Sequence, residues 1–161
     1  MASNLPTSRQ RDLVSIIPHL TIMGLLMFAY HQIDSEEFII YGALTYLVLS
    51  YGLKNFIPLN HRVGMRLVHK REFQNAIPYF EKGYDFFVKY AWLDKYRYLT
   101  LLSSSKMCYR EMALTNIAFC YSQIEEGDKA IEYYSRTVAE YPDNEMAKAA
   151  LNLIHSIDKK K

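Results

Sequence analysis

Hydrophobic positions are spread unevenly along the chain, and the first third is the most apolar part. Residues 13–33, LVSIIPHLTIMGLLMFAYHQI, contain no Lys, Arg, Asp or Glu. These 21 residues would span about 31 Å as a helix, close to the hydrocarbon thickness of a bilayer. After the acidic segment DSEE, residues 38–57, FIIYGALTYLVLSYGLKNFI, carry only Lys54 as a charge. The pattern predicts a two-helix transmembrane hairpin over residues 1–57, with spans at about 13–33 and 38–57.

Charges around the two apolar stretches predict their orientation. Arg9 and Arg11 precede the first stretch, and the DSEE segment has no basic residue. Five basic residues lie at the end of the second stretch or follow it: Lys54, Arg62, Arg66, Lys70 and Arg71. The positive-inside rule then predicts an integral, multi-pass protein with both termini in the cytoplasm. We expect these five residues to contact anionic lipid headgroups, each contributing roughly 1 kcal/mol.

The first stretch has two other interpretations. Pro18, His19 and His31 interrupt it and would also be compatible with a soluble core hairpin. A cleaved signal peptide is disfavoured, because no small-residue cleavage site follows and a second apolar stretch comes directly after.

Beyond Ile57 the pattern changes to charged, amphipathic helices, which predicts a second domain over residues 58–161. In FQNAIPYFEKGYDFFV and in GDKAIEYYSRTVAEY, apolar residues recur at steps of three and four, as on one helical face. Each segment follows another helical segment, HRVGMRLVHK and REMALTNIAFCYSQI respectively. With EMAKAALNLIHSI as a capping helix, the pattern predicts two helix pairs and an all-α fold.

The two predicted helix pairs share one spacing. Gly64 and Ala76 are twelve residues apart, and so are Ala118 and Ala130. Phe80 lies four residues after Ala76, and Tyr134 lies four residues after Ala130. Small residues at facing positions let two helices approach closely, and the aromatic ring fills the space beside the crossing.

On these residues the chain resembles the tetratricopeptide repeat (TPR) family, whose 34-residue unit follows a W-x2-L-G-x2-Y, A-x3-F, P pattern. Residues 111–144 match it at Leu114, Ile117, Ala118, Tyr121, Ala130, Tyr134 and Pro142. Residues 57–90 match at Val63, Gly64, Leu67, Phe73, Ala76 and Phe80, but lack the closing proline. The resemblance covers about 90 residues and implies a short TPR-like α-solenoid.

The resemblance also implies a binding groove, lined by the first helix of each pair, for a peptide or a partner helix. Projected onto this chain, the lining is His61, Met65, His69, Met112, Thr115, Asn116, Phe119 and Ser122. The family's carboxylate clamp needs several basic residues and asparagines there, and only Asn116 fits, so chaperone tails are disfavoured. Methionine and phenylalanine suit an apolar partner. The alternative is that these residues pack inside the domain.

Residues 91–110 form an insertion between the two pairs. It contains Trp92, Tyr96 and Tyr98, too many aromatic residues for a solvated linker. We expect prolonged flanking helices and a packed loop, with these three residues as an additional surface. Whether that surface is functional or structural stays open at this point.

The sequence offers little for catalysis. Ser103-x-x-Lys106 has the spacing of a serine nucleophile and a lysine base, but the partner motifs are absent, so a helix N-terminus capped by Ser103 or Ser105 is the ordinary interpretation. The five histidines form no metal-binding pattern, and no phosphate-binding loop is present. Cys108 and Cys120 form no CxxC pair, and a net charge of +2 does not favour nucleic acid. We expect no enzyme activity, no cofactor, no metal and no nucleic-acid partner.

The sequence therefore predicts a membrane-anchored, TPR-like scaffold that binds a protein partner at the membrane surface, with homo-oligomers possible. The alternative is a small structural or assembly subunit of a membrane complex, in which the hairpin makes the specific contacts.

Overall fold

A computed structural model describes residues 12–33 and 36–158, and this part of the chain is all-α. Arg9, Arg11 and the first half of the DSEE segment, which entered the orientation prediction, lie outside the described residues. The chain divides into two compact units. Unit 2 combines the described residues up to Pro58 with Ala91–Lys106, and the described residues of unit 1 are Leu59–Tyr90 and the chain from Met107 onward.

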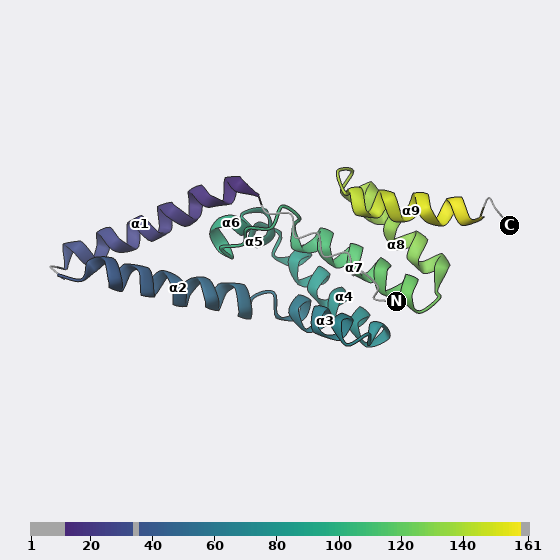
Figure 1. Cartoon of the computed structure of the whole chain (residues 1–161), viewed down its shortest axis with the longest axis horizontal. Coiled ribbons are helices and arrows are strands. Elements are labelled where there is room, and N and C mark those ends of the chain that lie inside the picture. The colour runs from purple at the N-terminus through teal and green to yellow at the C-terminus, as the bar shows by residue number, and fades with distance from the viewer. Residues whose placement is uncertain (1–11, 34–35, 159–161) are drawn as a thin grey trace. The chain divides into compact units, whose positions relative to one another are not determined.

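The described residues of unit 2 form one 3-10 helix and four α-helices. They are η1 (Leu13–Ser15), α1 (Ile16–Gln32), α2 (Phe38–Phe56), α5 (Ala91–Lys95) and α6 (Arg97–Thr100). Pro18 lies in the first turn of α1, where its missing N–H leaves no hydrogen bond unmade. α1 packs along α2 (Figure 1), and Gly42 allows a close approach, because a Cβ there would lie 2.7 Å from Met27 Cγ. The Tyr30 and Thr45 hydroxyls share a hydrogen bond of 2.9 Å across the same contact.

Only one described helical stretch is long and apolar enough to cross a membrane. It is Leu13–Gln32, with 20 residues and a mean hydropathy of 1.8. The predicted second span over residues 38–57 does not qualify, so the prediction of a multi-pass protein with two spans and both termini in the cytoplasm is wrong. The physical reason is the polar content of α2, which carries Tyr41, Tyr46 and Tyr51 and ends with Lys54 and Asn55. These groups shorten and dilute its apolar stretch.

The described residues of unit 1 form five α-helices, each packed against the next one of the unit. They are α3 (Leu59–His69), α4 (Phe73–Lys89), α7 (Tyr109–Gln123), α8 (Gly127–Glu140) and α9 (Glu145–Asp158). α3 contacts α4, α4 contacts α7, α7 contacts α8, and α8 contacts α9. Pro78 lies inside α4, on its exposed side, without ending the helix.

The small and aromatic residues that share the twelve-residue spacing lie in the interior of unit 1. Phe80 is fully buried, and a Cβ added at Gly64 would lie 2.7 Å from its ring. Ala118 and Ala130 are also fully buried, in one cluster with Tyr134. Ala147 of α9 completes that cluster. Close helix approach at these points therefore depends on the absence of larger side chains.

The turns inside the two helix pairs have the same geometry. Arg71 and Glu125 each lie seven residues after the small residue, and their φ angles are 63° and 64°. The next residue donates its N–H to the carbonyl five residues earlier, Glu72 to Leu67 (2.9 Å) and Glu126 to Tyr121 (3.1 Å). This pattern is that of a Schellman C-cap, in which a left-handed residue ends the helix. The two pairs are thus alike in their backbone as well as in their sequence spacing.

The insertion differs from its prediction. The flanking helices are not prolonged, because α4 ends at Lys89 and α7 begins at Tyr109. Two short helices, α5 and α6, fill the space instead, and Leu101 and Leu102 after them are fully buried. The N-cap of α7 is Cys108, not Ser103 or Ser105. It has extended backbone angles, and Glu111 three residues later completes a capping box.

Candidate binding surfaces

His61 of the predicted groove is half-buried, with its ring against the core of unit 1. Its ring is 5.6 Å from the rings of both Phe80 and Tyr109. Its Nδ1 is shielded from solvent and has no hydrogen-bond partner among the described residues. Burial disfavours the charged imidazolium and lowers the pKa of His61 to about 4. The neutral ring thus serves as a packing element.

Other groove residues are also engaged in internal contacts. Thr115 is buried, donates to the Glu111 carbonyl (2.9 Å) and accepts from the Asn144 side chain (3.1 Å). Phe119 packs edge-to-face on Phe73 at 5.8 Å. Met65 contacts the same core, Met112 and Asn116 are half-buried, and only His69 and Ser122 are exposed. These eight residues are therefore divided between interior and surface, and a groove role for them stays a prediction.

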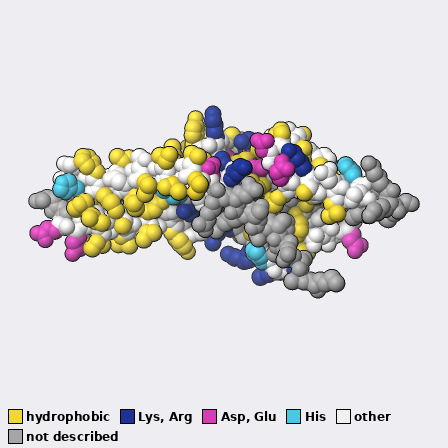
Figure 2. Space-filling model, turned by 45° about the horizontal axis from the view of Figure 1, so that its top comes forward, with side chains coloured by type: hydrophobic (Ala, Val, Ile, Leu, Met, Phe, Trp, Pro, Cys, Tyr) yellow, Lys and Arg dark blue, Asp and Glu magenta, His cyan; other side chains and the backbone are white. Residues whose placement is uncertain are grey.

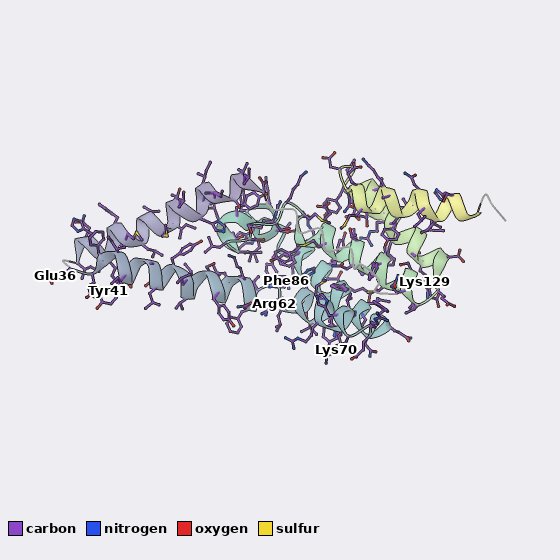
Figure 3. All side chains as sticks on the ribbon, viewed as in Figure 1. Glu36, Tyr41, Arg62, Lys70, Phe86 and Lys129 are labelled. Atoms are coloured by element: carbon purple, nitrogen blue, oxygen red, sulfur yellow. The ribbon has the colours of Figure 1, made fainter. Side chains whose placement is uncertain are left out.

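The basic residues expected at lipid headgroups fall on both units. Arg62 and Arg66 of α3 and Lys70 directly after it follow one another at four-residue steps and are exposed, as is Arg71 in the same turn. Figure 3 labels Arg62 on this helix and Lys70 just after its end. Lys54 belongs to unit 2, where it lines a cavity of about 480 Å³ with Asp12 and His19. Their contact with lipid stays a prediction.

Sequence reasoning did not find a second cavity, of about 270 Å³, in unit 1. Three helices line it: α4 with Glu81, Tyr84 and Asp85, α7 with Leu114 and Ile117, and α8 with Tyr133 and Arg136. Leu114 and Ile117 are almost fully buried and supply an apolar wall. The remaining residues are aromatic or charged.

Hydrogen bonds hold the charged side of this cavity in place. The Tyr84 hydroxyl donates to Glu140 Oε2 (3.0 Å) and accepts from Arg136 Nη2 (2.7 Å). Arg136 Nε also donates to Glu140 Oε1 (2.8 Å), and the Tyr133 hydroxyl donates to Glu81 (3.4 Å). Burial, followed by the bond to Glu140, raises the pKa of Tyr84. Glu140 forms a salt bridge with Arg136 and offsets its charge. The carboxylates of Glu81 and Asp85 therefore make the cavity suitable for a cation.

The surface of unit 2 is dominated by apolar side chains. Within the stretch Leu13–Gln32 only 6% of the residues are buried, and Leu25 and Phe28 are 62% and 61% exposed. Figure 2 shows hydrophobic side chains gathered over α1 and α2 at the left end of the view. Leu47 and Val48 of α2 are also exposed. Exposed apolar surface of this extent marks a site of contact with lipid or with another protein.

The three aromatic residues predicted as an insertion surface do not act alike. Trp92 and Tyr96 are exposed, whereas the Tyr98 hydroxyl donates to Asp12 Oδ2 (2.6 Å) and accepts from Arg97 (3.1 Å). The bond from Tyr98, followed by one from the Val14 N–H, lowers the pKa of Asp12. Tyr98 therefore ties α6 to the residue preceding η1.

The residues that the sequence offered for chemistry are placed as follows. The described residues contain no group of three or more His, Cys, Asp or Glu side chains that could hold a metal ion. Ser103 is buried, and its hydroxyl accepts from the Ser105 N–H (3.3 Å), while Lys106 is exposed. Burial raises the pKa of Cys120 to about 12, which keeps its thiol protonated.

The chain matches no protein-family model, no curated protein and no solved structure. The residues and contacts above are therefore the guide to function.

Proposed function

We propose that this protein is a non-catalytic interaction module that associates with a membrane through α1 of unit 2 and presents the helix pairs of unit 1 to a protein partner. One observation carries the membrane part: Leu13–Gln32 is apolar over 20 residues, yet only 6% of it is buried. The core helix of a soluble protein would be mostly covered by its own chain.

The free energy gained by covering the exposed apolar side chains of α1 supports membrane association. Covering a leucine or phenylalanine side chain that would otherwise face water stabilises by about 1.5–3 kcal/mol. Leu20, Leu25 and Phe28 alone, all more than half exposed, would gain roughly 5 kcal/mol in a lipid environment. Twenty helical residues span about 30 Å, which matches the hydrocarbon thickness.

The internal likeness of the two helix pairs supports a TPR-like arrangement of unit 1. Both pairs bury small residues at the same spacing and end their first helix with the same left-handed cap at Arg71 or Glu125. α9 packs on α8 as a capping helix would. Stacked helix pairs of this kind form surfaces for peptides or partner helices.

For the partner we propose a protein segment that carries a lysine or arginine. The cavity of unit 1 combines the apolar wall of Leu114 and Ile117 with the carboxylates of Glu81 and Asp85. A long basic side chain can lay its methylene stem on the wall and bring its charge to the carboxylates. A photo-crosslinker at Asp85 should therefore capture a peptide with a basic residue at the adduct, while one at exposed Glu145 on α9 should not. Equal capture at both positions would contradict this docking site.

Membrane association is tested by flotation of the full chain with phospholipid vesicles. The wild type should float, and Leu25→Lys with Phe28→Lys should remain at the bottom, because both side chains are exposed and the change leaves the interior intact. The control variant, Gln74→Lys with Gln123→Lys, adds the same charge at exposed positions of unit 1 and should float. Circular dichroism checks that all three proteins are equally helical. A wild type that stays at the bottom would overturn the proposal.

A second candidate function, a subunit of a membrane complex, is favoured by α2. Leu47 and Val48 are exposed, although α2 is too polar to qualify as a span. An apolar but non-spanning helix is suited to being covered by other protein helices. A photo-crosslinker at Leu47 should then yield protein adducts in native membranes, whereas lipid adducts alone would favour the first function.

A further inference from the structure

The short helices α5 and α6 carry their large apolar side chains on the outside. Trp92, Tyr96 and Leu99 are separated by four and three residues, the spacing of one helical face. Backbone hydrogen bonds from Tyr96 to Trp92 (3.0 Å) and from Leu99 to Tyr96 (2.8 Å) keep the three in helical register. They are 58%, 52% and 51% exposed.

Several polar side chains of the same segment face inward, although Lys95 is exposed. Asp94 is fully buried, and Arg97 donates to the carbonyl oxygens of Asp94 (3.4 Å), Ser105 (3.0 Å) and Lys106. Tyr98 donates to Asp12. A helix in water shows the reverse arrangement, with charged residues outside and apolar residues inside. The inversion indicates that the face formed by Trp92, Tyr96 and Leu99 is covered when the protein functions.

The position of this face within unit 2 indicates what covers it. α6 contacts α1, and the Asp12 N–H donates to the Ser104 carbonyl (3.0 Å) just after α6. Figure 1 shows α5 and α6 beside the end of α1 at which the apolar stretch begins. Asp12, immediately before Leu13, is the charged residue that ends this stretch. The aromatic face therefore lies at the level where the apolar surface of α1 gives way to charge.

The composition of the face fits that level. Tryptophan and tyrosine prefer the boundary between headgroups and acyl chains, because their rings are apolar and their N–H and O–H groups need polar partners. Lys95, exposed beside them, holds its ammonium 5.4 Å from the centre of the Tyr96 ring, where it can meet a lipid phosphate. A buried protein interface would leave this lysine without a comparable partner.

We propose that Trp92, Tyr96 and Leu99 form an interfacial anchor that inserts into the headgroup–acyl boundary of the leaflet at the Asp12 end of α1. This inference rests on the proposed membrane association and adds a second, shallow contact to it. The insertion then has a function of its own, which is to fix the depth of α1 in the bilayer. Its polar groups form hydrogen bonds with Asp12, and its apolar side chains enter the lipid.

Trp92 is the only tryptophan of the chain, so its fluorescence reports on this face alone. The full-length protein is mixed with vesicles of phosphatidylcholine and a minority of phosphatidylglycerol, in which the phosphatidylcholine is brominated either near the top or near the end of its acyl chains. We expect a blue-shifted emission on binding, and at least twofold stronger quenching by lipid brominated near the top. Tyr96→Ser with Leu99→Ser should weaken this quenching while flotation persists.

Two variants calibrate the depth. Trp92→Phe with Leu25→Trp places the fluorophore near the middle of the apolar stretch of α1, and it should be quenched more strongly by deep bromine. Trp92→Phe with Gln123→Trp places it on the exposed surface of unit 1, and it should not be quenched. Protein that floats while Trp92 is unquenched, or is quenched best by deep bromine, would overturn the interfacial anchor and leave membrane association standing. Protein that does not float would overturn both.

Discussion

Replacing Gly64 by alanine tests the close helix approach on which the fold of unit 1 depends. The added Cβ would lie 2.7 Å from Phe80 Cε1 and 2.9 Å from two further atoms of the same ring. Real Cβ atoms do not approach other carbons so closely, so the ring or the helix must move. Phe80 is fully buried and its ring is in contact with His61, which leaves little room to move.

The magnitude follows from two opposing effects. Overpacking a dense core by one methyl group costs typically about 1–3 kcal/mol. Alanine is about 1 kcal/mol better than glycine inside a helix. We therefore expect Gly64→Ala to lower the free energy of unfolding of unit 1 by up to about 2 kcal/mol, despite its better helix propensity.

Gly83→Ala is the matched control on the neighbouring helix. Its Cβ would meet the His61 backbone N at 3.7 Å and Asn60 Cβ at 3.8 Å, which is ordinary van der Waals contact. In this variant the better helix propensity of alanine should raise the free energy of unfolding by about 1 kcal/mol. The two glycine-to-alanine changes should therefore differ in sign, and their unfolding midpoints by roughly 4–8 °C for each kcal/mol of difference.

The assay is thermal and urea unfolding of the full-length variants, followed by circular dichroism, with hydrogen exchange of peptides from α3 and α4 to assign the change to unit 1. Phe80→Leu removes part of the ring, so Gly64→Ala should cost less in that background than in the wild type. If Gly64→Ala were as stable as Gly83→Ala, the close packing of α3 on α4 would not exist as described.

Three further predictions concern buried polar groups of unit 1. The pKa of His61 is about 4 in the folded protein against 6.5 in a free side chain. The neutral ring should therefore stabilise the fold fully above pH 6.5, and the free energy of unfolding should fall by on the order of 3 kcal/mol as the pH drops toward 4. Urea midpoints at pH 7 and 4.5 should show this loss, and His61→Phe should remove it. Asn144→Ala deletes the cap on the Ala147 N–H (2.8 Å) and the bond to Glu111 (3.0 Å), so it should cost about 2 kcal/mol and speed hydrogen exchange in α9. Unchanged exchange there would contradict the cap. Cys120, fully buried with a raised pKa, should resist alkylation at pH 8 until the protein unfolds, as mass spectrometry of the labelled peptide can show; rapid labelling in the native state would refute its burial.

The insertion at residues 91–110 shows what a local sequence pattern can and cannot predict. Its composition predicted a packed segment with Trp92, Tyr96 and Tyr98 as a surface, and the structure exposes the first two. Tyr98 was the exception, because its partner Asp12 is 86 residues away in the chain. A residue's neighbours on its own helix say nothing about such a contact.

The cavity in unit 1 was missed for the same reason. Tyr84 belongs to the apolar face that the periodicity of its own segment predicts, whereas its partner Arg136 lies 52 residues away in the chain. His61 shows the opposite case: a residue that the repeat pattern placed in an open groove is enclosed by Phe80 and Tyr109.

By itself, the sequence determined where the helices of unit 1 form and which small residues they bury, because helical periodicity and the repeated Gly64/Ala118 spacing are local properties of the chain. It also determined that the first third is apolar. The tertiary structure decided which faces are covered, that residues 91–106 join the apolar helices in unit 2, and where polar groups converge. The physical reason is that burial and hydrogen bonding depend on partners far along the chain, whereas helix formation depends mainly on neighbours within one or two turns.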